Sequence, residues 1–147
     1  MASHTFTVRS NLAPARAFAR LIDLECVPQW DAGVRGSKRI DPGDGHVGAR
    51  YEVTVTGFDG QPTTVVYEVT DVDEPKRFVM VGQNEVFRAA DTLAFEPVES
   101  GCELTYHGTL DFVGDDPPLT AEQLDAVFPK VAGVAEAGLT EFLNRPD

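Results

Sequence analysis

The chain has 147 residues, of which 24 are acidic and 12 are basic, so its formal net charge is −12. A chain of about 150 residues buries roughly 68–70% of its unfolded surface, which is enough for one domain to fold without disulfides or metals. The negative surface repels phosphate backbones and anionic lipids, and we therefore expect neither nucleic acid nor a membrane as a partner.

The two cysteines, Cys26 and Cys102, lie far apart and form no Cys-x-x-Cys motif. The chain runs from Met1 directly into alternating residues, and no stretch reaches the ~18 apolar residues of a membrane span. These features predict a cytoplasmic location, no membrane insertion and two free thiols, with one disulfide as the alternative. We expect a single domain over residues 1–147. The oligomeric state does not follow from the pattern.

Residues 5–10 alternate polar and apolar side chains, as a strand with one buried face does. A short helix over residues 14–22 follows, with Pro14 in its first turn and Asn11 as the expected N-terminal cap. A second short turn ends at the segment Pro28-Gln29-Trp30-Asp31.

Further strands are predicted in a continuous meander between residues 34 and 112. Period-two alternation marks the strands, and turn residues such as Asp59-Gly60 separate them. Because short turns join consecutive strands, the strands should pair antiparallel. The predicted ranges are 34–40, 51–56, 65–70, 77–81, 87–95 and 102–112.

The C-terminal segment has helical periodicity instead. Thr120 and Gln123 have the spacing of a capping box, and apolar residues then recur every three or four positions up to Phe142. Pro129 lies within this pattern, so we expect a kink or two abutting helices. Small residues, including Gly133 and Gly138, make the middle of the helix slim. They either leave room for a cavity or allow the helix to pack closely on the sheet.

This order of elements predicts an α+β fold in which a curved antiparallel sheet of about seven strands surrounds one long helix. The two short helices after the first strand would close one end of the groove. Natural ligand pockets are mostly apolar with a few polar groups. The gap between sheet and helix is therefore expected to hold a small hydrophobic molecule.

Several short segments between residues 5 and 143 form a recognisable set. They are Val27-Pro28-Gln29-Trp30-Asp31, residues 45–51, 67–70 and 75–78, Asp91-Thr92-Leu93-Ala94-Phe95-Glu96-Pro97 and residues 101–106. In these segments the chain resembles the START-like (SRPBCC) superfamily, and especially its polyketide cyclase/dehydrase branch. The resemblance implies a helix-grip fold with an apolar cavity. Members bind lipids, sterols, polyketides or plant hormones, and some catalyse cyclisation or dehydration.

Asp91 is the first candidate catalytic residue. It alternates in phase with Leu93 and Phe95, on the side of the strand assigned to the cavity. Desolvation there would raise the pKa of the carboxyl group toward neutrality, as acid/base chemistry requires. The alternative is a structural Asp that pairs with Arg88 or hydrogen-bonds the backbone.

Tyr106 is the second candidate catalytic residue, because a phenol on the inner face can polarise a ligand carbonyl. Tyr67 would orient the ligand in the same way, and Trp30 would cover it or plug the core. The remaining expected ligand contacts are Tyr51, Leu93, Phe95, Leu104, Phe128, Val131 and Ala135.

The three histidines are not expected to form a site: His4 is terminal, His46 lies in a turn and His107 points outward. No metal-ligand spacing, phosphate loop or nucleophile elbow is present, so we expect no metal and no cofactor. The sequence favours binding of a small hydrophobic ligand, lipid or polyketide-like. The alternatives are a cyclase/dehydratase that uses Asp91 and the cavity tyrosines, and an interaction module.

Overall fold

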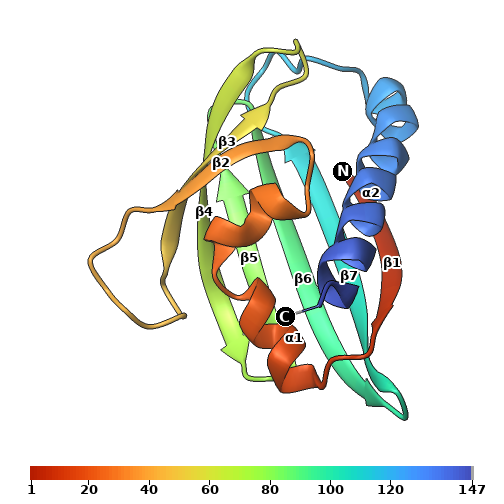
Figure 1. Ribbon diagram of the computed structural model, residues 1–147. Coiled ribbons are helices and arrows are strands. Elements are labelled where there is room, and N and C mark those ends of the chain that lie inside the picture. Colours follow the sequence, from red (N-terminus) through yellow and green to blue (C-terminus); the bar gives the residue numbers. More distant parts are fainter. Residues whose placement is uncertain (147) are drawn as a thin grey trace.

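The computed structural model describes residues 1–146 (Figure 1). The helices are α1 (Pro14–Leu21), the 3-10 helix η1 (Leu24–Gln29) and α2 (Ala121–Asn144). The strands are β1 (Ala2–Ser10), β2 (Val34–Arg39), β3 (Arg50–Thr56), β4 (Pro62–Asp73), β5 (Arg77–Gln83), β6 (Phe87–Val98) and β7 (Gly101–Phe112).

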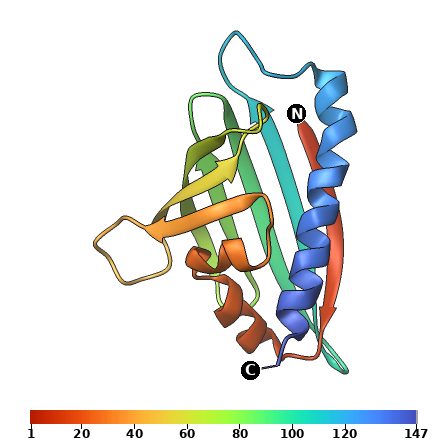
Figure 2. The same cartoon turned by 45° about the horizontal axis from the view of Figure 1, so that its top comes forward.

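The seven strands form one antiparallel sheet in the order β1-β7-β6-β5-β4-β3-β2. Strands β2 to β7 follow one another along the chain, and β1 pairs with β7 at the far edge. The sheet curves, and α2 lies along its concave side next to β1, while α1 and η1 close one end (Figures 1 and 2). The predicted α+β helix-grip architecture is confirmed.

The start of α1 differs from the prediction. Its N-cap is Ala13, which makes no side-chain cap, so the assignment of that role to Asn11 was wrong. Ser10 organises this turn instead: its hydroxyl accepts from the Leu12 N–H at 3.1 Å and donates to the Leu143 carbonyl at 2.7 Å. Ser10 is 4% exposed, and these two bonds satisfy a polar group that would otherwise be costly to bury. They also connect the end of β1 to the end of α2.

Helix α2 is continuous from Ala121 to Asn144 with Pro129 inside it, so the expectation of two abutting helices was wrong. The predicted capping box of Thr120 and Gln123 is confirmed. Proline removes only one backbone donor, and the buried apolar stripe of the helix, which includes Leu139 and Leu143, holds the remaining turns in place. Among the described residues no helix has the length and apolar character to cross a membrane.

The two glycines of α2 do not thin the helix on its cavity side. A Cβ at Gly138 would collide with the Trp30 carbonyl oxygen, so this glycine permits contact with the chain that follows η1. A Cβ at Gly133 would meet nothing within 4 Å, and this residue faces outward. A small helix residue that does line the hollow between helix and sheet is Ala135, so the glycines do not supply the room expected from a slim helix.

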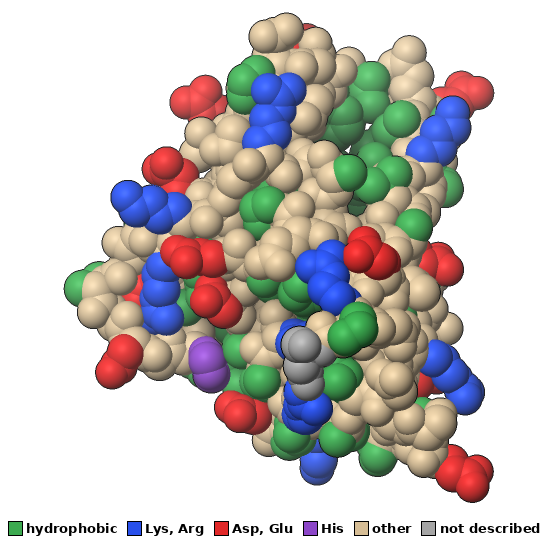
Figure 3. Space-filling view, viewed as in Figure 1, with side chains coloured by type: hydrophobic (Ala, Val, Ile, Leu, Met, Phe, Trp, Pro, Cys, Tyr) green, Lys and Arg blue, Asp and Glu red, His purple; other side chains and the backbone are tan. Residues whose placement is uncertain are grey.

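The interior contains two apolar clusters. The larger one surrounds α1 and the lower part of the sheet, where the ring of Phe18 packs edge-on against Phe78 and Phe95 at centroid distances of 5.6 Å. The smaller one, which includes Phe87, Leu124 and Phe128, lies under the N-terminal half of α2. Both cysteines are free thiols. In the space-filling view, apolar side chains gather in a hollow beside the upper end of α2 (Figure 3).

Candidate functional site

Gly82 makes room for a tyrosine on the inner face of the sheet. Tyr67 and Gly82 are direct partners on β4 and β5, and a Cβ at Gly82 would lie 2.5 Å from Cζ of the Tyr67 ring. The ring therefore lies across the glycine and reaches toward β6. A larger residue at position 82 would displace the phenol.

Gly108 has a similar effect on β7. Its partners are His4 on β1 and Asp91 on β6, so the three residues form one row across the sheet. A Cβ at Gly108 would lie 2.8 Å from both the Asp91 Oδ1 and the His4 Nε2. The carboxyl group and the imidazole therefore approach the same gap from opposite sides.

Two adjoining hollows open between this part of the sheet and α2. The inner hollow has a volume of about 50 Å³ and reaches toward η1, where Trp30 and Leu24 form its wall. The outer hollow has a volume of about 230 Å³ and is bounded by α2 through Phe128, Val131 and Ala135. Side chains that line both hollows are Asp31, Val34, Val55, Tyr67, Asp91 and Tyr106.

Four polar residues of that shared wall, together with His4 on the outer hollow, make a polar cluster between the two apolar clusters of the interior. They come from four strands and one loop, which no local sequence pattern brings together. The members are His4 (β1), Asp31 (after η1), Tyr67 (β4), Asp91 (β6) and Tyr106 (β7).

Asp91 is the central acid of the polar cluster. The pKa of its carboxyl group is raised to about 7: burial is the main cause, a hydrogen bond from the Tyr106 hydroxyl opposes the shift, and the negative charge of Asp31 adds to it. The alternative partner, Arg88, is exposed and alternates to the opposite face of β6. The side chain of Asp91 is thus poised between its neutral and charged forms near pH 7.

The other acids of the cluster are shifted in the same direction. Burial raises the pKa of Asp31, although its Oδ1 accepts a hydrogen bond from the Gly33 N–H at 2.9 Å. Burial also raises the pKa values of Tyr67 and Tyr106, and the nearby Asp91 charge adds to both shifts. The two phenols therefore stay protonated and can donate hydrogen bonds.

His4 lines the outer hollow, a position that the sequence analysis did not give it. β1 begins at Ala2 because its pairing with β7 extends to Leu110. His4 consequently faces inward, with its ring stacked on Tyr106 at 5.8 Å and tilted against Phe128 at 4.9 Å. Burial lowers the pKa of its imidazole, His107 lowers it further, and the buried Nδ1 has no hydrogen-bond partner within residues 1–146.

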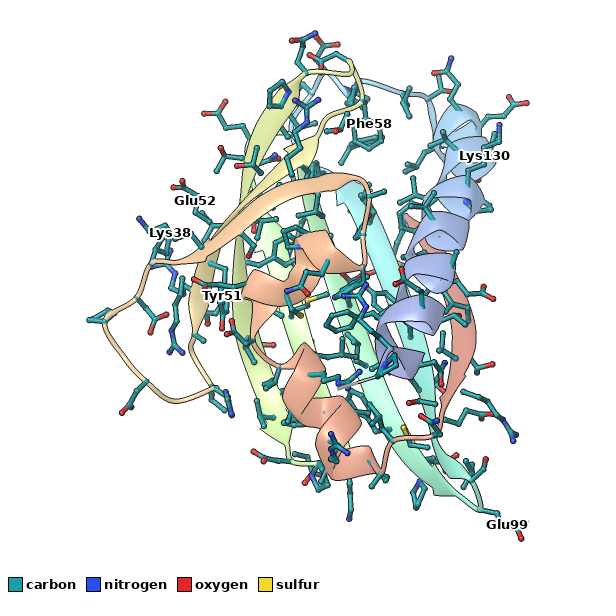
Figure 4. All side chains as sticks on the ribbon, viewed as in Figure 1. Lys38, Tyr51, Glu52, Phe58, Glu99 and Lys130 are labelled. Carbon is teal, nitrogen blue, oxygen red and sulfur yellow. The ribbon has the colours of Figure 1, made fainter. Side chains whose placement is uncertain are left out.

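The predicted site residues divide between the hollows and the closed core. Trp30 lines the inner hollow, and Phe128, Val131 and Ala135 line the outer one. Tyr67, Asp91 and Tyr106 line both. Tyr51, Leu93, Phe95 and Leu104 line neither; each is at most 3% exposed, in the packed part of the interior. In Figure 4, Tyr51 lies near η1, away from the upper end that Phe58 and Lys130 mark.

Asp31 is the second residue that the sequence analysis did not select. It belongs to the segment Val27-Pro28-Gln29-Trp30-Asp31 that carries the family resemblance, so a signal was present. For His4, the alternation of Phe6 and Val8 extended by one step would have placed it on the inner face. No group of three or more metal-ligating side chains occurs in the part of the chain that the structure describes.

Solved structures with the same fold cover almost the whole chain. A START superfamily protein from Mycobacterium smegmatis has a TM-score of 0.78 at 14% identity, over 97% of this chain and 95% of that one. The di-domain ARO/CYC StfQ from the steffimycin biosynthetic pathway has a TM-score of 0.70 at 13% identity, over 96% of this chain and 50% of that one. Ara h 8.0201 has a TM-score of 0.65 at 23% identity, over 97% and 99%.

These likenesses show a shared fold. No protein with curated annotation matches the sequence. The family model described as polyketide cyclase / dehydrase and lipid transport matches residues 1–144. Since that match covers nearly the entire sequence, the chain belongs to the polyketide cyclase / dehydrase and lipid transport family.

Proposed function

We propose that the protein binds a small hydrophobic molecule, lipid or polyketide-like, with a single polar group placed at the polar cluster. The observation that carries this proposal is the arrangement of the two hollows: their outer walls are apolar, and they meet at Asp91 and Tyr106. An apolar body in the hollows and a hydrogen-bonding group at their junction would satisfy both surfaces.

The size of the hollows limits the ligand. Pockets for drug-sized molecules commonly have volumes of ~300–1,000 Å³. The outer hollow of about 230 Å³ and the inner one of about 50 Å³ are both smaller than that range. A body of one or two rings, or a short acyl chain, fits this space better than a sterol or a two-chain lipid.

Relatives support the proposal at the level of ligand class. The family description names both polyketide cyclases/dehydrases and lipid transport, and the similar di-domain protein is named ARO/CYC. Lipid transport and the conversion of a polyketide both require that the protein first bind its molecule. Binding is therefore the step that the family and the geometry of this chain have in common.

The test is to fill the outer hollow without touching the polar cluster. Ala89→Leu places a larger side chain on its wall, while Ala90→Leu on the opposite face of β6 is the matched control. We expect the purified protein to carry an apolar ligand detectable by mass spectrometry, or to gain thermal stability with a panel of small lipids. Ala89→Leu should lose both effects and Ala90→Leu should keep them. Absence of any bound ligand and of any thermal shift in the unmodified protein would contradict the proposal.

A second candidate function is a cyclisation or dehydration reaction in the same site. Asp91, with a pKa of about 7, could donate or accept a proton, and Tyr106 could hydrogen-bond a carbonyl or departing hydroxyl. Carboxyl-selective NMR on the protein and on Asp91→Asn would identify the titration of this group. A midpoint near 7 favours acid/base chemistry, and a midpoint near the ordinary value of about 3.9 opposes it.

A further inference from the structure

The cavity walls contain acidic groups but no strongly basic ones. Across both hollows, as the structure describes them, the ionisable wall residues are Asp31, Asp91, Tyr67, Tyr106 and His4, and none is Lys or Arg. Burial favours the neutral form of His4. The walls therefore offer two carboxyl groups and no fixed positive charge.

An anionic ligand would be held poorly by such walls. A carboxylate or phosphate moved out of water needs a cation or several donors to compensate for its lost hydration. Here Tyr67 and Tyr106 offer one phenolic donor each, and the donor of Tyr106 is already engaged with Asp91. The two neighbouring carboxyl groups would either repel the anion or have to stay protonated.

An ammonium group meets the opposite situation. A carboxylate accepts charge-assisted hydrogen bonds from it, and aromatic faces attract a cation through their quadrupole. Tyr67, Tyr106 and Phe128 place such faces around the position of Asp91, and Trp30 adds another at the inner end. The imidazole of His4 approaches Gly108 through its Nε2, which can accept a hydrogen bond in the tautomer that carries its hydrogen on Nδ1.

We infer that the cavity selects its ligand by charge: it takes a small apolar molecule that carries an amine, and it rejects the matching carboxylate or phosphate. The inference rests on the proposed binding function and names the ligand class for the same site. The amine lies in the outer hollow where Asp91 and His4 line its wall, and the apolar body fills the rest of that hollow.

Because ligand binding is linked to the protonation of Asp91, the affinity for each class of ligand should depend on pH in a different way. The groups facing Asp91 are Tyr106 from β7, His4 from β1, Tyr67 from β4 and Asp31 from the chain after η1; the α2 residues on the wall are apolar. An ammonium lowers the pKa of Asp91 and expels its proton, so amine affinity rises with pH up to the pKa of free Asp91. A carboxylate raises that pKa and takes up a proton, so its affinity falls as pH rises. A neutral alcohol does not shift the pKa of Asp91, and its affinity therefore does not change with pH.

The experiment compares three probes of one shape: naphthylethylamine, naphthylethanol and naphthylacetic acid. Titration calorimetry with the full chain between pH 5.5 and pH 8 (roughly 1.5 units below and 1 unit above the Asp91 midpoint) measures affinity and proton exchange. We expect the amine to bind at least about tenfold more tightly than the alcohol at pH 8, with proton release near pH 6. The acid should bind weakest and with the opposite pH slope.

Variants test whether the two cavity acids cause the preference for the amine. Asp91→Asn and Asp31→Asn should each reduce the ratio of amine to alcohol affinity, and the double variant should abolish it. Asp73→Asn is the matched control, because it removes the same charge from an exposed position at the end of β4. Circular dichroism and naphthylethanol binding confirm that each variant is folded.

Every outcome decides between the two proposals. Equal affinity for the three probes, or tighter binding of the acid, overturns the amine inference and leaves the binding function standing. An amine preference that survives in the double variant also overturns the inference, because the charge would then act from outside the cavity. If none of the three probes binds at any pH, both proposals fail.

Discussion

The two ends of the helix grip share one sheet and one helix, yet one end is solid and the other is hollow. Near α1 the inner face carries Phe78, Leu93, Phe95 and Leu104, which are at most 3% exposed and interdigitate with Phe18. Toward the N-terminal half of α2 the same strands carry Ala89, Gly82 and Gly108. Side chains of Tyr67, Asp91 and His4 cover the two glycines, and the open part of the interior is bordered by small residues of both the sheet, Ala89, and the helix, Ala135.

The polarity of the interior also changes from the end near α1 toward the N-terminal half of α2. The packed end holds almost only apolar side chains, whereas the polar cluster separates the two apolar clusters farther up the sheet. Buried carboxyl groups are costly unless they have partners or can be protonated, and Asp91 meets that requirement through Tyr106 and a raised pKa. A protein retains such a group where it serves a ligand more than it serves stability.

The largest effect should come from the packed end. Phe78→Ala removes a fully buried ring and leaves a cavity, and we expect a loss of about 3–5 kcal/mol in the free energy of unfolding, measured by urea denaturation. Met80→Ala, next to the inner hollow, should cost less because one side of that residue already faces open space. Equal losses for the two variants would contradict the distinction between the ends.

The second largest effect should be the pH dependence of the unfolding free energy that Asp91 causes. Its pKa is about 7 when folded, above the ordinary value of about 3.9, so the native state binds more protons than the unfolded state between these values. Stability should therefore fall as pH rises from about 4 to 7, with a slope of up to about 1.4 kcal/mol per pH unit from this group. Denaturation of wild type and Asp91→Asn over this range measures it.

The Asp91→Asn variant should lack that component of the slope and become more stable relative to wild type as pH increases. Asp73→Asn, at an exposed position, should follow the wild-type curve. Parallel curves for Asp91→Asn and wild type would show that the carboxyl group titrates normally in the folded protein.

The glycines of α2 should respond in opposite directions. Gly138→Ala forces a Cβ against the Trp30 carbonyl and should cost about 1–3 kcal/mol of unfolding free energy, as overpacking does. Gly133→Ala meets open space and should gain about 0.5–1 kcal/mol from helix propensity. Thermal unfolding of both variants measures the pair. A gain for both would mean that the helix stands farther from Trp30 than described.

The smallest stability effect should accompany a large loss of binding. Gly108→Ala introduces a Cβ near the ends of two side chains, Asp91 and His4, which can shift by small rotations, so we expect a destabilisation below about 1–1.5 kcal/mol. Ligand affinity should fall at least tenfold, because the added methyl group occupies the gap between them. Calorimetry with an apolar amine measures this, and an unchanged affinity would place the ligand elsewhere.

Much of the architecture and part of the site could be predicted from local patterns. Alternation placed Asp91, Tyr67 and Tyr106 on the inner face, and the capping box of α2 followed from the spacing of Thr120 and Gln123. Such features depend on residues that are neighbours along the chain, and their side-chain directions follow from a fixed period. The family resemblance then added the helix-grip arrangement, which the family match supports.

Two predictions needed more than the local pattern. The glycines of α2 were assigned to a cavity or to contact with the sheet, but what they meet depends on where the chain after η1 passes. Likewise, Leu93, Phe95 and Leu104 share a face with Asp91, and only the position of α1 buries that stretch. The periodicity of the sequence identifies which face of a strand or helix is apolar, but it cannot identify which other element packs on that face.

By itself, the sequence determined which residues form strands and helices and which side of each strand turns inward, because periodicity is a local property. The tertiary structure decided that β1 starts at Ala2, that His4 and Asp91 meet across Gly108, and that Asp31 joins them from the chain after η1. These contacts depend on strand register and on how closely separate elements approach. Both are set by the packing of the whole chain, so the polar cluster exists only in the folded protein.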